Sequence, residues 1–170
     1  TTTEVLCPNE SCEEGALGQC IYDSKTKKLI CGTMADGNKL YLVDPEAKTF
    51  SKWPARGAKE RSHYEVQVVA IYNNYVYIVI TTPGFSAKLY RIKVDDFYSV
   101  FGKDSIEDHA EHVMDLGADM PFRETGFVYN KKVYLWSGAL DLDKLTITSY
   151  SGIPKRYLGT KYGIDFGNNA

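Results

Sequence analysis

The sequence predicts an all-β protein built from antiparallel sheets. Aromatic residues make up 13% of the 170-residue chain, with 13 tyrosines, and aromatic side chains favour the half-buried surface of a sheet. Runs that alternate apolar and polar residues recur along the chain, and turn-forming residues separate them, as expected of strands in hairpins. The longest apolar run, residues 75–80 (YVYIVI), has the length of a strand and is far short of the roughly 18 residues of a membrane span. We therefore expect no membrane-spanning helix.

The cysteines are confined to the first 31 residues. They are Cys7, Cys12, Cys20 and Cys31. An even, clustered set predicts two disulfide bonds, for which three connectivities are open. Free buried thiols are one alternative, and a zinc site is a weaker one, because the spacing contains no C-x-x-C pair. The sequon that begins at Asn9 lies among these cysteines and makes Asn9 a candidate glycosylation site. Together these features predict an extracellular, secreted protein.

The chain divides into a cysteine-containing N-terminal segment (1–20), a β region (21–152) and a C-terminal tail (153–170). Residues 1–20 show neither a strand nor a helix period, so we expect short loops held by disulfide bonds. A β pattern starts at residue 21. The strands that the alternation predicts are residues 29–33, 40–43, 49–53, 64–71, 75–82, 88–94, 126–129, 133–136 and 145–150.

Two of these segments carry further detail. In the hairpin 39–54, Pro45 fixes the turn and the side chain of Asp44 caps it. Residues 75–82 are nearly all apolar, which indicates a central strand buried on both faces. In the preceding strand, alternation places Val66, Val68 and Ala70 on one side.

The β pattern is interrupted at residues 95–120. Ser105 is placed to cap a short helix whose apolar face would run through Ile106, His109, Val113 and Met114. Further along, residues 137–143 are predicted to be a loop before the last strand.

Three segments repeat the same order of turn and strand. They are anchored at Tyr22, Tyr72 and Tyr129, which indicates a four-stranded unit with a period of about 50 residues, as in propeller blades. We take the later strand of each unit to begin at a Lys-Leu pair, at Lys39, Lys88 and Lys144. Such units bury their faces by stacking on one another.

Residues 40–54 (LYLVDPEAKTFSKWP) resemble the closing half of a kelch-type repeat. Residues 61–77 and 123–134 resemble the opening half, although the kelch double glycine is replaced by other residues in both copies. The resemblance implies antiparallel, propeller-like blades that serve as an interaction scaffold. Three units are fewer than the roughly four to eight blades of a closed propeller. The chain is then a fragment of a propeller, is completed by oligomerisation, or has another β architecture.

Basic residues gather in one predicted loop. Together with an adjacent histidine and one aromatic residue of the loop 82–86, they form our candidate ligand-binding set: Arg56, Lys59, Arg61, His63 and Phe85. An ordinary exposed loop is the alternative for this cluster.

No catalytic residue or metal site is assigned. His109 and His112 with the acidic residues around them lack the order of a metalloprotease motif, and we expect a solvated acidic segment there. The pair Asp141 and Asp143 has too few oxygens for a calcium loop and predicts a hairpin turn. We expect no cofactor.

The kelch resemblance implies a binding module, so we expect a binding protein rather than an enzyme. The net charge of −2 provides no general attraction to nucleic acid or to an anionic membrane. The first hypothesis is an extracellular module whose inter-strand loops bind a protein ligand or receptor. The alternatives are a lectin-like module in which an exposed tyrosine or tryptophan stacks on a glycan, and a secreted hydrolase whose site is assembled from distant residues. A homo-oligomer stays open. A deep pocket in which His63 or His112 is hydrogen-bonded to a carboxylate would favour the hydrolase.

Overall fold

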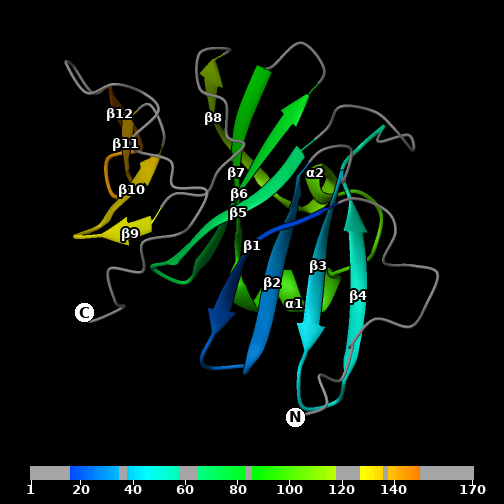
Figure 1. Ribbon diagram of the computed structural model, residues 1–170. Coiled ribbons are helices and arrows are strands. Elements are labelled where there is room, and N and C mark those ends of the chain that lie inside the picture. Colours follow the sequence, from blue (N-terminus) through cyan, green and yellow to red (C-terminus); the bar gives the residue numbers. More distant parts are fainter. Residues whose placement is uncertain are drawn as a thin grey trace.

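The computed structural model describes residues 16–34, 38–57, 65–82, 86–117, 127–135 and 138–149. Within these residues the chain forms twelve strands and two short helices, so the prediction of a mainly antiparallel β protein is confirmed (Figure 1). In the described parts of the chain, no helix is long and apolar enough to cross a membrane.

Consecutive strands pair in three antiparallel meanders of four strands each. The first sheet contains β1 (Ala16–Asp23), β2 (Lys28–Met34), β3 (Lys39–Asp44) and β4 (Thr49–Pro54). The second contains β5 (Glu65–Tyr72), β6 (Tyr75–Thr82), β7 (Ser86–Lys93) and β8 (Glu111–Gly117). The third contains β9 (Phe127–Tyr129), β10 (Lys132–Leu135), β11 (Gly138–Asp141) and β12 (Thr146–Ser149).

The first and second of these four-stranded groups, called the first and second sheets below, belong to one continuous eight-stranded sheet, because β2 pairs antiparallel with β5. The only register pair between these two strands is Thr33 with Val66, and the Gln67 amide donates to the Thr33 carbonyl over 3.1 Å. Beside it, a Cβ added to Gly32 would lie 2.6 Å from the Val66 carbonyl oxygen. Only glycine permits this close approach of the two strands.

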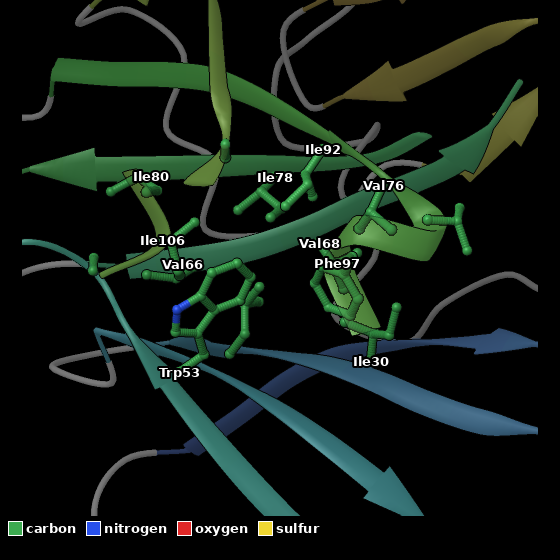
Figure 2. Packing of buried hydrophobic residues seen from close by; sticks show 14 residues of the cluster. Ile30, Trp53, Val66, Val68, Val76, Ile78, Ile80, Ile92, Phe97 and Ile106 are labelled. Atoms are coloured by element: carbon green, nitrogen blue, oxygen red, sulfur yellow. The ribbon is translucent and has the colours of Figure 1, made fainter. Parts of the chain in front are cut away.

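Two helices fill the space between the first and second sheets. They are α1 (Val94–Val100) and α2 (Ile106–His109), in the connection from β7 to β8. Figure 2 shows Trp53 and Ile30 of the first sheet facing Val66 and Ile78 of the second, with Phe97 of α1 among them. The Trp53 indole donates to the Lys103 carbonyl over 3.0 Å, which satisfies its buried N–H.

The opposite face of the second sheet packs on the third sheet. Val79 and Leu89 from the second sheet form a buried cluster with Val133 and Leu140 from the third. The second sheet is therefore covered on both faces, and the predicted double-sided burial of β6 is confirmed. Among the described residues the sheets form no closed propeller.

The structure corrects the predicted facing of β5. Val66 and Val68 pack toward the first sheet, whereas Ala70 packs toward the third. A register shift between Val68 and Ala70 explains the change, because a bulge adds one residue and reverses the alternation beyond it.

Three other element predictions were wrong. The helix predicted from Ser105 ends at His109, and Val113 and Met114 lie in β8, paired with β7. Residues 138–141, predicted as loop, form β11. The strand after Lys144 is therefore the fourth of its sheet, whereas the strands that contain Lys39 and Lys88 are each the third, so the three are not equivalent as predicted. The first strand begins at Ala16, inside the segment predicted to be loops.

Candidate functional site

The meanders place the strand connections at two ends of the sheets. The first end, which we call the turn end, carries the short β1–β2, β3–β4, β5–β6, β9–β10 and β11–β12 turns. The second, which we call the loop end, is where Glu65 pairs with Thr81 and Ala87 pairs with Gly117. The end of β4 also lies there, because Pro54 pairs with Lys39 at the start of β3.

Hydrogen bonds close the turns of the turn end. The Asp44 carboxylate accepts from the N–H groups of Glu46 and Ala47 over 3.1 and 2.9 Å, as predicted for this turn. The Asp141 carboxylate accepts in the same way from Asp143 and Lys144. The predicted hairpin turn at Asp141 is therefore confirmed. The carboxylate oxygen that faces the turn accepts hydrogen bonds from backbone N–H groups.

Arg56 is the one candidate ligand-binding residue inside the described part of the chain. Its guanidinium pairs with the Asp108 carboxylate at 2.5 Å, and its N–H donates to Glu107 over 2.7 Å. The Ser105 hydroxyl and N–H, followed by the Arg56 guanidinium, lower the pKa of Asp108 to about 2. The Arg56 side chain thus connects the segment that follows β4 to α2. Lys59, Arg61, His63 and Phe85 lie outside the described residues.

One predicted disulfide bond is present. Cys20 and Cys31 are directly paired across β1 and β2, with Cα atoms 4.0 Å apart, and their sulfur atoms are bonded. This bond removes both thiols from the alternative zinc site. Cys7, Cys12 and the sequon residue Asn9 lie outside the described residues.

A buried carboxylate organises the turn end between the first and second sheets. Asp23, only 6% exposed, accepts hydrogen bonds from the Tyr98 hydroxyl (2.7 Å), the Thr26 hydroxyl (2.9 Å) and the Lys25 N–H (3.0 Å). Burial raises the pKa of Asp23, but these donors outweigh burial, and its pKa lies below the ordinary value. Burial and the hydrogen bond to Asp23 raise the pKa of Tyr98. Asp23 is therefore an anion held between the β1–β2 turn and α1.

A pocket of about 250 Å³ opens beside this carboxylate. One wall is the β1–β2 turn, the other is the β5–β6 turn, and the start of α1 completes it. The lining residues are Tyr22, Asp23, Ser24, Lys25, Ile71, Tyr72, Asn73, Asn74 and Val94.

The far wall of the pocket also contacts the third sheet. The Tyr72 hydroxyl donates to Asp143 over 2.6 Å, and this bond raises the pKa of Tyr72 to about 12. The Lys131 ammonium lies 3.4 Å from the same carboxylate. These contacts hold the β5–β6 turn against the turns of the third sheet.

The histidines within the described residues form no common site. His109 closes α2 and packs on the Trp53 ring, with ring centroids 6.0 Å apart. His112 lies on β8 and contacts Asp115 over 3.1 Å, with both side chains exposed to solvent. The turn-end pocket contains neither histidine. The described residues include no group of three or more histidine, cysteine or carboxylate side chains arranged for a metal ion.

From the sequence alone, the residues that line the pocket are predicted to lie in turns and at strand ends. Asp23 and Tyr98 are 75 residues apart, and the two walls come from different repeats. No short motif connects them, so only the fold shows that they meet.

Comparison with known proteins adds no assignment. No family model matches the chain, and searches of curated proteins and of solved structures gave no significant match.

Proposed function

We propose that this protein is an extracellular binding module whose loop end engages a protein partner. The observation that carries the proposal is the convergence of strand ends. β4 and β6 end at the loop end, and β5 and β7 begin there. Residues 55–64 and 83–85 therefore connect strands at the same end, and these connections contain Arg56, Lys59, Arg61, His63 and Phe85.

The packing of the second sheet supports a scaffold role for the strands. Buried clusters cover both of its faces, and tight turns close the turn end. Binding residues are commonly placed on loops that such a rigid framework holds in position. The disulfide bond between Cys20 and Cys31 is compatible with an oxidising, extracellular environment.

A propeller-like arrangement is part of the same proposal. Each meander has the four antiparallel strands of a blade, and neighbouring sheets stack face to face, which supports the resemblance to kelch-type repeats. Three stacked sheets form only part of a ring, with an outer sheet at each open end. A second copy of this chain, or a further chain, then completes the ring. Light scattering tests this: a mass of two or three chains supports completion, whereas a cooperatively melting monomer contradicts completion by assembly.

A binding screen with matched charge removal tests the loop end. The labelled protein is applied to a display panel of extracellular protein domains. The loop-end variant is Lys59→Ala/Arg61→Ala. The control, Lys93→Ala/Lys144→Ala, removes the same charge from two exposed positions of the turn end.

The two variants give opposite expectations. A specific partner should bind the loop-end variant about tenfold more weakly, because truncation of a central charged contact typically has this effect. The control should bind normally. Absence of any specific partner, or equal weakening by both variants, would contradict the proposal.

A further inference from the structure

We propose that the turn-end pocket is a second binding site, at the opposite end from the proposed protein interface, and that it takes one or two rings of a neutral saccharide. A pyranose ring has an apolar C–H face and an edge of hydroxyl groups. A site for it needs an exposed aromatic face, an apolar floor and side chains that both donate and accept hydrogen bonds. The pocket supplies each of these from residues that line it.

Tyr22 supplies the aromatic face. Its side chain lines the pocket and is 56% exposed, which is unusual for a large apolar side chain in this structure. The floor is formed by Ile71 and by Val94, which is 7% exposed. A ring that stacks on Tyr22 therefore also removes apolar floor from water.

Asn73 and Asn74 supply the polar rim. Both have positive φ angles of 47° and 64°, as in the tight hairpin turn that asparagine favours. Both residues are exposed at the mouth of the pocket. Each amide offers a carbonyl acceptor and two N–H donors, which complement hydroxyl groups that also donate and accept.

The two walls are held in place before any ligand arrives. The Tyr98 hydroxyl on α1 binds Asp23 in the β1–β2 wall, and the Val94 N–H at the start of α1 donates to the Asn74 carbonyl over 3.0 Å. The same helix thus fixes both walls. Because the walls are already fixed, less conformational entropy is lost on binding, and a shallow site can still bind a ligand.

The charges of the lining favour a neutral ligand. The Asp23 carboxylate already accepts three hydrogen bonds from its own chain. It therefore does not require a hydrogen-bond donor or a positive charge from the ligand. Lys25 is the lining cation and offsets the charge of Asp23. A volume of about 250 Å³ is below the roughly 300–1,000 Å³ of sites for drug-sized molecules, which limits the ligand to one or two rings.

Saturation-transfer NMR with defined sugars tests the site. The probes are glucose, galactose, mannose, fucose, N-acetylglucosamine and their β-linked disaccharides. We expect saturation transfer to at least one of them, with a Kd on the order of 1 mM for such a shallow, partly solvated site. Absence of transfer to every probe overturns the proposal.

Two variant pairs locate the bound sugar. Tyr22→Ala should weaken binding about tenfold through loss of stacking, whereas Tyr22→Phe should retain it. The control is Tyr129→Ala, at another exposed strand-end tyrosine that does not line the pocket. Asn74→Gly removes one amide and keeps the positive φ, and Asn130→Gly does the same in the β9–β10 turn.

The pairs also separate a binding defect from a folding defect. Asn74→Gly keeps the turn geometry, so its weaker binding with an unchanged melting temperature supports the site even if Tyr22→Ala is unstable. Binding that survives in both Tyr22→Ala and Asn74→Gly overturns the assignment. Lys59→Ala/Arg61→Ala should leave sugar binding unchanged. Loss of sugar binding at the turn end can therefore be distinguished from loss of protein binding at the loop end.

Discussion

Replacement of Gly32 by alanine should loosen the junction of the first and second sheets. A Cβ at this position would lie 2.6 Å from the Val66 carbonyl oxygen, 2.7 Å from the Gln67 amide oxygen and 2.9 Å from the Gln67 Cα. A flexible side chain can relieve only the second of these contacts, because the other two atoms belong to the backbone of β5. The strands must therefore separate where Thr33 pairs with Val66.

The expected loss of stability follows from two opposing effects. Overpacking of this kind costs about 1–3 kcal/mol, and alanine recovers about 0.4–1 kcal/mol by restricting the unfolded chain. We expect a net loss of about 1.5 kcal/mol, equivalent to a fall in melting temperature of about 3–6 °C for a chain of this size. Urea unfolding followed by tryptophan fluorescence, with Trp53 buried nearby, measures the free energy, and circular dichroism measures the melting temperature.

Two companion variants identify the cause. Gln67→Ala removes the amide oxygen but leaves both backbone contacts, so Gly32→Ala should remain destabilising in the double variant. If Gly32→Ala costs nothing in the Gln67→Ala background, the clash involves only the side chain, and the backbone argument is refuted. Gly57→Asn is the control, since its site is open and its φ of +68° suits asparagine. Its stability should change by less than about 0.5 kcal/mol.

The remaining predictions concern the turn end, the core and the cysteines. Hydrogen bonds to Asp23 hold its pKa below the ordinary 3.8, so its stabilising contribution is complete above that pH and is lost as the pH falls through the folded-state pKa. In acid-unfolding curves, the stability advantage over Asp23→Asn should shrink below about pH 4; a difference that is independent of pH would contradict this. Leu89→Asp or Val133→Asp, both 0% exposed, should unfold the protein because an unpaired buried charge costs several kcal/mol, and an unchanged melting temperature would contradict the strand assignments. Cys20→Ser/Cys31→Ser should cost about 3 kcal/mol in urea unfolding, given the separation of 11 residues that the bond closes, and an unchanged unfolding midpoint would contradict this contribution. If all four cysteines are bonded, the intact mass should be about four hydrogens below the reduced mass, and equal masses would exclude disulfide bonds.

Local patterns predicted most strands because each strand carries its own alternation. The run 75–82 is apolar throughout, and β6 is buried on both faces as that pattern indicates. The Asp44 turn was equally local, since its carboxylate binds N–H groups two and three residues later. Features of this kind need no information from the rest of the chain.

The errors arose where tertiary contacts override the local pattern. The Ser105 cap is present, with Asp108 completing its capping box, but the chain from Glu111 onward forms β8 and pairs with β7 instead of extending the helix. β11 is only four residues long, and its glycine and aspartate are typical of loops. The bulge in β5 moves Ala70 to the opposite face, and the residue types around it do not indicate the shift.

The pocket could not be predicted from the sequence, because it too depends on tertiary contacts. Tyr22 and Asn74 belong to different repeats, and each was assigned to a strand end or turn. Their approach depends on the packing of the first and second sheets around α1. A sequence period locates equivalent turns, but it does not show which of them form a shared cavity.

The helical insertion explains why the turn end differs between repeats. In the first and third sheets, the connection of the last two strands is a short turn closed by Asp44 or Asp141. In the second sheet, residues 94–110 take its place and form α1 and α2. Phe97 then fills the core between the first two sheets, while Tyr98 and the Val94 N–H reach the turns on either side. The same insertion therefore stabilises the sheet interface and shapes the walls of the pocket, so the chemistry of the pocket depends on the one repeat that departs from the pattern.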